Sequence, residues 1–326
     1  MKHLLFRSAL LFLTLCSAWL TANAQIVPAP TEKQLSAIEK IMAPQRKKVT
    51  DILDADKTGQ YKIYQNDLKA LSQEKDPTQK KVLADKIRRD HYIFIKAAFV
   101  AAKIDLKAIR PQISDILKTD RFTLDEFGGL SSSTFLPKFE LPLKFDSEIV
   151  CPFDSPQEVS NGGGLAGCSS TVETCRIFTD ANSYILAGGC RNKASLGGKF
   201  ELPSGNFQKI TVAAQFDAFY YGNAAALGGY GQFNVKIGVR LQGPGLDKVV
   251  IVHDAWCIAP VIFFSQIEMD ADNFLAQAVF TGSFAGENLF TAQAYNETFA
   301  IASLIGNATG FSISSNFDFI RVKATN

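Results

Sequence analysis

Residues 210–220 read ITVAAQFDAFY, and residues 233–241 read FNVKIGVRL. In both stretches every second side chain is apolar or aromatic, and in the second the polar Asn234, Lys236 and Arg240 alternate with them. Successive side chains of a β-strand point to opposite faces of the sheet. The alternation therefore predicts antiparallel strands that have one buried and one solvated face.

Similar segments, separated by Gly, Asn and Asp, continue from residue 198 to residue 324. Antiparallel strands with turn residues between them are typical of a β-sandwich, for which we expect a jelly-roll-like arrangement. In the last segment Phe311 and Ile313 have one parity and Ile320 and Val322 the other, which predicts a β-bulge. The expected strands lie near residues 198–202, 208–220, 230–242, 248–264 (two strands), 274–284, 291–303 and 310–323.

The first third of the chain has apolar residues at helical spacing. Thr31 is a candidate N-cap, and Pro44 is expected to interrupt the helix that follows it. Further helices are predicted at 61–73, 78–106 and 111–117.

The predicted class is therefore α+β, with an N-terminal antiparallel helical unit followed by a mainly antiparallel β-sandwich. The expected divisions of the chain are a signal peptide at 1–24, a helical domain at 25–127, a linker with disulfide-tied loops and the first strands at 128–197, and the sandwich core at 198–326.

The N-terminus has the pattern of a secretory signal peptide. Lys2 and Arg7 precede a short apolar run, and Ala22 and Ala24 supply the small side chains of a cleavage site before Gln25. The run is shorter than the roughly 20 residues of a membrane-spanning helix. We expect a secreted, periplasmic or cell-surface protein with no membrane span after cleavage.

Five cysteines remain after this cleavage, and four of them are clustered. Exported proteins commonly form disulfides, so we predict two bridges within the cluster, and the spacing leaves their pairing open. Cys257 lies in an apolar strand, and we expect it to be the buried, free thiol. The clustered residues are Cys151, Cys168, Cys175 and Cys190.

The distribution of charge argues against a nucleic-acid-binding protein. Of 34 basic residues two lie in the predicted signal peptide, which leaves 32 against 32 acidic ones. Residues 31–127 hold 20 basic and 15 acidic residues, and residues 128–326 hold 12 and 17. Nucleic-acid binding requires a strongly basic patch. The modest opposite charges favour contact between the two halves.

Two acidic segments are candidate Ca²⁺ sites, because hard cations bind clustered carboxylate and amide oxygens. Asp54 to Gly59 is similar to the start of an EF-hand loop, but Gln65 stands where a bidentate Glu is needed, which favours a polar helix–helix loop. The other segment is expected to form one loop between strands, where the alternative is an ordinary acidic turn. The candidate ligands in this second segment are Glu268, Asp270, Asp272 and Asn273. Apart from Ca²⁺, no cofactor is expected.

Three tyrosines are the candidate ligand-binding residues. Tyr220, Tyr221 and Tyr230 flank the Gly-rich stretch 222–231, where the absence of side chains permits close approach of a ligand such as a glycan. We expect these tyrosines to be exposed. The alternative for this stretch is a flexible hairpin end.

The mature sequence shows no constellation for nucleophilic catalysis. Its only histidines are His91 and His253. Asp254 follows His253 directly and therefore points to the opposite face of the strand. Cys257 lies about 13 Å along the strand from His253, which is too far for a Cys–His pair. A pair of catalytic carboxylates has no sequence signature, so a glycosidase stays an alternative.

These features favour a non-enzymatic exported protein whose β-sandwich serves binding, adhesion or cell-envelope structure, with a glycan or an envelope protein as partner. One alternative is a secreted or periplasmic hydrolase that acts on glycans through two carboxylates. Another is a periplasmic chaperone-like helical protein, which requires an exposed apolar surface around residues 93–104.

Overall fold

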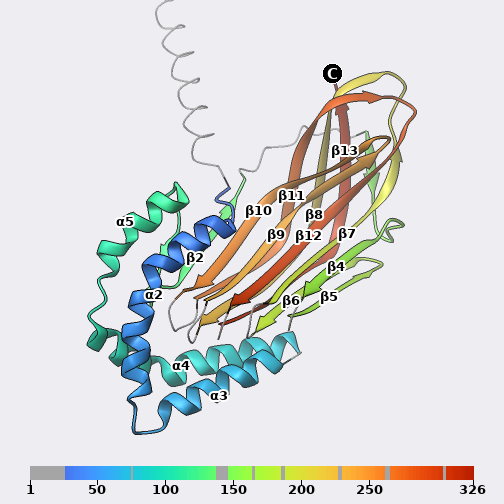
Figure 1. Cartoon of the computed structure of the whole chain (residues 1–326). Helices are drawn as coiled ribbons and strands as arrows, with labels where there is room; N and C mark the ends of the chain where they lie inside the picture. Colours follow the sequence, from blue (N-terminus) through green and yellow to red (C-terminus); the bar gives the residue numbers. More distant parts are fainter. Residues whose placement is uncertain are drawn as a thin grey trace, which may run out of the picture.

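Four α-helices are followed by a sandwich of two antiparallel sheets, as Figure 1 shows for the described part of the chain. This computed structural model describes residues 26–74, 76–136, 146–163, 166–184, 188–226, 230–260, 265–303 and 306–326. The predicted signal peptide lies outside these residues. The α+β class and the antiparallel sandwich are confirmed, whereas the jelly-roll arrangement stays a prediction.

Two of the predicted helices begin within one residue of their expected positions, at Gln60 and Pro77, whereas the last begins at Leu106, five residues before its predicted start, and contains Pro111 in its interior. Helix α2 starts at a capping box, in which the Thr31 side chain accepts a hydrogen bond from the Gln34 backbone and the Gln34 side chain accepts one from the Thr31 backbone. The helices are α2 (Glu32–Asp54), α3 (Gln60–Gln73), α4 (Pro77–Ala102) and α5 (Leu106–Leu117).

The predicted interruption at Pro44 is wrong. Helix α2 continues through this residue, although proline removes one hydrogen bond of the helix ladder. Met42 and Val49 on either side of it are fully buried in the core, and this packing holds the two halves of the helix together. Arg46, one turn after Met42, forms an ion pair with Glu39 and donates a hydrogen bond to the carbonyl of Pro260.

Two sheets form the sandwich, and all their strand pairs are antiparallel. In spatial order, the seven-stranded sheet contains β1 (Thr123–Leu124), β2 (Leu130–Phe135), β10 (Leu246–Ala259), β9 (Tyr230–Gly243), β12 (Leu289–Ser303), β7 (Gly188–Glu201) and β4 (Gln157–Gly163). The other contains β11 (Ser265–Ala285), β8 (Asn206–Ala226), β13 (Gly306–Thr325), β6 (Arg176–Tyr184) and β5 (Ala166–Glu173), with β3 (Ser147–Ile149) beside β13.

The alternation in β8 and β9 agrees with the sequence, whereas β10 forms one strand where two were expected across 248–264, and β11 begins at Ser265, nine residues before the predicted start at 274. The predicted bulge in the last strand is confirmed, because the register of β13 against β8 shifts between Ser315 and Phe319. The prediction of loops between Cys151 and Cys190 is wrong. This segment contains β4, β5, β6 and the start of β7, whose Gly- and Ser-rich composition is typical of loops. Ladders with distant β12 and β13 hold it in strands, which local composition does not reveal.

The cysteine prediction is confirmed. Disulfides join Cys151 to Cys175 and Cys168 to Cys190, and Cys257 is free and fully buried. The bridges span sequence separations of 24 and 22 residues within the segment that contains β4 to β7. Such crosslinks stabilise the fold mainly by restricting the unfolded chain.

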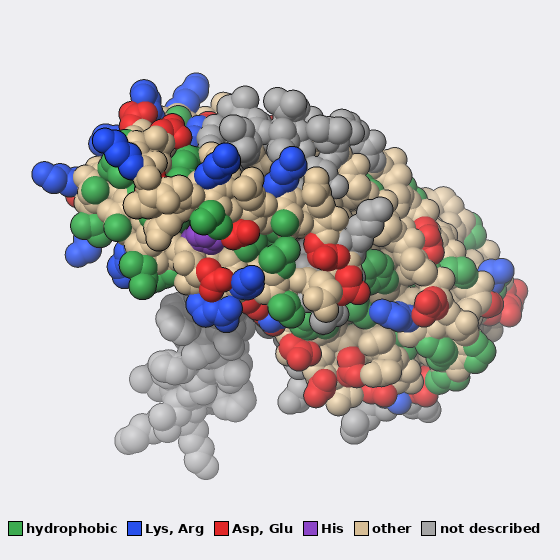
Figure 2. All heavy atoms as spheres, turned by 90° about the horizontal axis from the view of Figure 1, so that it is seen from below, with side chains coloured by type: hydrophobic (Ala, Val, Ile, Leu, Met, Phe, Trp, Pro, Cys, Tyr) green, Lys and Arg blue, Asp and Glu red, His purple; other side chains and the backbone are tan. Residues whose placement is uncertain are grey.

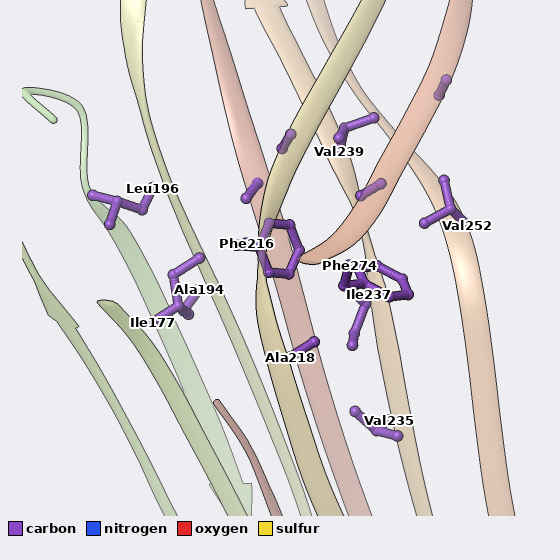
Figure 3. Close-up of a cluster of buried hydrophobic side chains, with 14 of the residues drawn as sticks. Ile177, Ala194, Leu196, Phe216, Ala218, Val235, Ile237, Val239, Val252 and Phe274 are labelled. Atoms are coloured by element: carbon purple, nitrogen blue, oxygen red, sulfur yellow. The ribbon is translucent and has the colours of Figure 1, made fainter. Parts of the chain in front are cut away.

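Two buried clusters hold the fold together. The first lies between the sheets and contains the inward side chains of β8 and β9 that the alternation predicted; Figure 3 shows Phe216 and Val235 among them. The second lies between the helices and one end of the sandwich, and it combines Ile95 of α4 with Tyr221 of β8 and Trp256 of β10. The helices therefore pack directly on both sheets. Of the described helices, none combines the length and apolarity needed to cross a membrane.

Candidate ligand-binding face

One face of the seven-stranded sheet is polar where it extends beyond the helices. Its side chains have the opposite parity to the inward residues of the same strands, such as Val235 and Ala255, so they point away from the core. We call this surface the polar face. It comprises Gln157 of β4, Arg191, Lys193 and Ser195 of β7, Asn234, Lys236 and Arg240 of β9, Asp254 of β10, and Gln293, Tyr295, Glu297 and Phe299 of β12.

A row of alternating charge crosses this face. In the strand registers Asp254 lies opposite Lys236, Lys236 opposite Glu297, and Glu297 opposite Lys193. Four adjacent strands thus carry negative, positive, negative and positive side chains at one level. Opposite charges in directly facing positions stabilise neighbouring strands. The row ties β10, β9, β12 and β7 together on their outer side.

Asp254 is almost completely buried, with 3% of its surface exposed. Its Oδ1 accepts a hydrogen bond of 2.7 Å from Nδ2 of Asn234, and its Oδ2 lies 3.9 Å from Nζ of Lys236. Burial raises the pKa of Asp254 to about 6, against the opposing effects of Lys236 and Asn234. The negative charge of Glu297, two strands away, raises this pKa further.

Glu297 is buried to a similar extent, with 7% of its surface exposed. The Tyr295 hydroxyl donates a hydrogen bond of 2.6 Å to its Oε2, and Nε of Arg191 lies 3.4 Å from its Oε1. The Arg191 guanidinium also lies 5.1 Å from the ring centre of Phe299. Half of the Arg191 side chain is exposed, so this cation is fixed from below by Glu297 and Phe299 and is accessible from above.

Arg240 is the centre of a second network. Its Nε and Nη2 donate hydrogen bonds of 2.8 and 2.7 Å to the two carboxylate oxygens of Asp247, a bidentate arrangement. Its Nη1 donates to Oε1 of Gln157 at 2.6 Å. Hydrogen bonding and the positive charge of Arg240 lower the pKa of Asp247. Close by, Ser195 donates to Oε1 of Gln293.

The two networks place different groups at different depths. The carboxylates of Asp254 and Glu297 are nearly buried, whereas Arg191 and, to a smaller extent, Lys236 and Arg240 extend toward solvent. Each of these cations is oriented by a carboxylate partner. A ligand on the polar face therefore meets pre-oriented basic groups together with the exposed amide of Gln157.

The tyrosine candidates lie elsewhere, and the predicted exposure is wrong for two of them. Tyr220 and Tyr221 are both 0% exposed, because the other sheet covers one face of β8 and the helices cover the other at this point. The Tyr220 hydroxyl lies between the sheets, and the Tyr221 ring lies under Lys81 of α4 at 5.7 Å. Tyr230 is partly buried, and burial raises its pKa. Ligand contact at these tyrosines stays a prediction.

The acidic candidates for Ca²⁺ lie within β11, so their predicted placement in a loop is wrong. Long-range pairing with β8 extends the strand through them, with a register shift between Ala271 and Phe274. Nζ of Lys81 lies 3.2 Å from Oε1 of Glu268. No cluster of three or more His, Cys, Asp or Glu side chains suited to a metal occurs among the described residues. Calcium binding by Glu268, Asp270, Asp272 and Asn273 stays a prediction.

The segment that is similar to an EF-hand loop joins α2 to α3. The Asp56 carboxylate accepts hydrogen bonds from the backbone N–H groups of Thr58 and Tyr61, which lowers its pKa together with a bond from the Thr58 hydroxyl. Its oxygens are therefore used to cap the loop and the start of α3. The segment is a loop between two helices, as predicted, whereas calcium binding by it stays a hypothesis.

His253 lies in a buried chain of hydrogen bonds. Its Nδ1 donates to the Thr134 carbonyl at 3.0 Å, and its Nε2 accepts from the Tyr220 hydroxyl at 3.0 Å. Tyr220 in turn lies 3.3 Å from Oγ of Ser133, and the Phe135 ring stacks on His253. Burial lowers the pKa of His253 to about 4, so the imidazole is neutral near pH 7.

Sequence reasoning missed the polar face as a site. The alternation of Asn234, Lys236 and Arg240 along β9 indicated a polar strand face, but it was interpreted as solvated and not as a binding site. Glu297 and Arg191, which complete the site, lie on β12 and β7. The order in which these strands pair has no signal in the local sequence.

Comparisons with known protein families and with curated proteins find no match. Among solved structures the chain is similar to the family 11 carbohydrate-binding module of Clostridium thermocellum, in complex with a β-1,3-1,4-mixed-linked tetrasaccharide, at 12% identity, with 60% of this chain and 97% of that one covered and a TM-score of 0.17. The chain is also similar to a lipoprotein of Bacteroides thetaiotaomicron, at 9% identity, with 60% of this chain and 95% of that one covered and a TM-score of 0.18. TM-scores this low carry no argument about fold or ligand, so the proposals below rest on the geometry of this chain.

Proposed function

We propose that the protein is an exported, non-enzymatic binding protein that holds an acidic glycan on the polar face. The observation that carries the proposal is the set of basic side chains oriented by carboxylates beneath them, with Arg191 half exposed above Glu297. Pre-oriented cations bind anionic groups at a smaller cost in side-chain entropy than free ones. The two disulfides fit an oxidising, extracellular compartment.

An exposed neutral group beside the cations supports a carbohydrate over other anions. Gln157 accepts a hydrogen bond from Arg240, and its exposed amide can pair with sugar hydroxyls, whereas Gln293 and Tyr295 are 0% and 4% exposed and hydrogen-bond within the protein. Lys236 and Arg240 are four residues apart on β9, about 13 Å at the usual rise of a strand. This spacing fits an extended ligand that carries several anionic groups. Carboxylates within the same face weigh against a nucleic acid, which requires a strongly basic surface.

The test is titration calorimetry of the mature protein with acidic polysaccharides, polygalacturonate and alginate, and with the neutral polysaccharide xylan. Arg191→Gln and Lys193→Gln each remove one positive charge from the polar face. Lys209→Gln is the control, because it removes the same charge from an exposed position on β8 of the other sheet.

Binding of an acidic polysaccharide is expected to weaken about tenfold in Arg191→Gln, the usual effect of losing one charge-assisted hydrogen bond. Lys193→Gln is expected to weaken it in the same direction, and Lys209→Gln to leave it within twofold. Equal affinity for xylan, or equal weakening by Lys209→Gln, would refute an acidic-glycan site on the polar face.

A glycan hydrolase is the second candidate, because two carboxylates of different environment lie in one row. Asp254 and Glu297 stand on either side of Lys236, about 10 Å apart by two strand spacings. This is close to the upper limit of the carboxylate separation in inverting glycosidases, roughly 6.5–9.5 Å. The burial of both carboxylates favours binding over catalysis. Release of reducing ends by the wild-type protein, abolished in Asp254→Asn with binding intact, would favour the hydrolase.

The chaperone-like alternative loses its main support. It requires an exposed apolar surface on α4 around residues 93–104, and Ile95, Ala98 and Phe99 are instead buried in the cluster shared with the sandwich. Only single side chains of this stretch, such as Ile93, remain exposed. A concave apolar surface for unfolded clients is therefore not formed by these residues.

A further inference from the structure

Helix α4 exposes a line of aliphatic side chains that the sandwich does not cover. Val82, Ile93 and Val100 are 58%, 80% and 70% exposed. At 3.6 residues per turn, Val82 and Val100 point in the same direction, and Ile93 deviates from it by about 20°. The line runs about 27 Å along the helix at the usual rise per residue.

Basic side chains fill the spaces in this line. Lys86, Arg89 and Lys96 are exposed and deviate from the same direction by at most about 40°. Two of them have acidic neighbours: Arg89 lies 3.3 Å from Asp90, and Lys96 lies 3.0 Å from Glu126. We call the aliphatic and basic residues together the α4 stripe, which comprises Val82, Lys86, Arg89, Ile93, Lys96 and Val100.

Figure 2 views the molecule from below, the side on which α3 and α4 lie in Figure 1, and shows basic and hydrophobic side chains interspersed over the helical end. The charge of this half agrees, with 20 basic and 15 acidic residues in 31–127. The stripe lies on the convex side of one helix and is one side chain wide. A stable protein interface needs about 800 Å² on each partner. A peripheral contact with a flat anionic surface can be made by a single line of side chains.

We propose that the α4 stripe docks on an anionic lipid surface, as a peripheral contact. Its aliphatic side chains reach the boundary between headgroups and acyl chains, and its lysines and arginine pair with anionic headgroups. Helices that lie in a membrane interface combine apolar side chains with lysines and arginines. The polar face belongs to the seven-stranded sheet, so it is independent of this contact. The inference therefore does not rest on the proposed glycan binding.

Tryptophan fluorescence of Ile93→Trp tests the docking directly. The mature chain has one tryptophan, Trp256, which is fully buried, so the new indole is the only exposed one. Vesicles of phosphatidylglycerol and phosphatidylcholine in equal parts are expected to shift its emission to shorter wavelength. Vesicles of phosphatidylcholine alone are expected to leave it unchanged. Val279→Trp, at an exposed position on β11 of the sandwich, is the matched control.

Co-sedimentation with the same vesicles separates the two contributions. The double variant Lys86→Gln and Arg89→Gln is expected to bind about 25-fold more weakly, at about fivefold for each basic residue. The triple variant Val82→Ser, Ile93→Ser and Val100→Ser, whose positions are exposed and whose fold circular dichroism checks, is expected to lose most of its binding.

Three results would overturn the proposal. The first is wild-type affinity of the triple serine variant, which would show electrostatic adsorption that does not use the aliphatic side chains of the stripe. The second is an equal emission shift in Val279→Trp, and the third is absence of binding to the anionic vesicles, which would leave the stripe to an acidic protein partner. Failure of glycan binding with intact vesicle binding would refute only the proposed function.

Discussion

His253 and Asp254 are adjacent on β10, and we predict that they give the stability of the protein opposite dependences on pH. Burial lowers the pKa of His253 from 6.5 to about 4 and raises that of Asp254 from 3.8 to about 6. Between pH 4 and 6.5 the unfolded chain binds more protons at His253, so this residue makes the free energy of unfolding rise with pH. Between pH 3.8 and 6 the folded chain binds more protons at Asp254, so this residue makes it fall as pH rises.

Each contribution is about 3 kcal/mol over its range, at 1.36 kcal/mol for each unit of pKa difference. The two nearly cancel in the wild-type protein between pH 4 and 6. Asp254→Asn removes one of them. The unfolding free energy of this variant, relative to wild type, is therefore expected to rise by about 3 kcal/mol from pH 4 to pH 7. His253→Gln is expected to show the reverse slope, falling by about 3 kcal/mol over the same range.

The assay is equilibrium unfolding in urea at several pH values, with the mutant-minus-wild-type difference taken at each pH so that other titrating groups cancel. Asp247→Asn is the control. Because Arg240 lowers the pKa of Asp247, the unfolding free energy of this variant relative to wild type is expected to decrease as pH rises. A flat difference for Asp254→Asn, or a slope of the same sign as that of Asp247→Asn, would refute the burial argument.

Two further predictions concern the core. Gly222→Ala is expected to destabilise the sandwich by about 1–3 kcal/mol in urea unfolding, because the new methyl group would overlap the Phe233 ring. Gly189→Ala is the control, because open space surrounds this position and a much smaller effect is expected. In thiol titration the native mature protein is expected to react at no cysteine and the unfolded, unreduced protein at one, since Cys257 is free and buried and burial raises its pKa; rapid labelling of the native protein would contradict this.

The helical half shows how far local pattern reaches. The candidate N-cap Thr31 and the apolar spacing of α2 to α4 predicted the helices, because capping and periodic burial act within a few turns. The predicted interruption of the helix at Pro44 is wrong, because packing against residues far away in the sequence offsets the cost of one missing hydrogen bond. The opposite charges favoured contact between the two halves, and the cluster that Trp256 shares with the helices shows that they pack on the sheets.

The sequence by itself determined the sandwich class, because alternation in β8 and β9 records which side chains are buried, and cysteine clustering with an N-terminus that has a signal-peptide pattern indicated the disulfides. Only the tertiary structure decided the polar face. Lys236 meets Asp254 and Glu297 because β10 and β12 flank β9, although β12 is far from it in the chain. Strand order depends on the sum of many long-range contacts, and no local pattern encodes it.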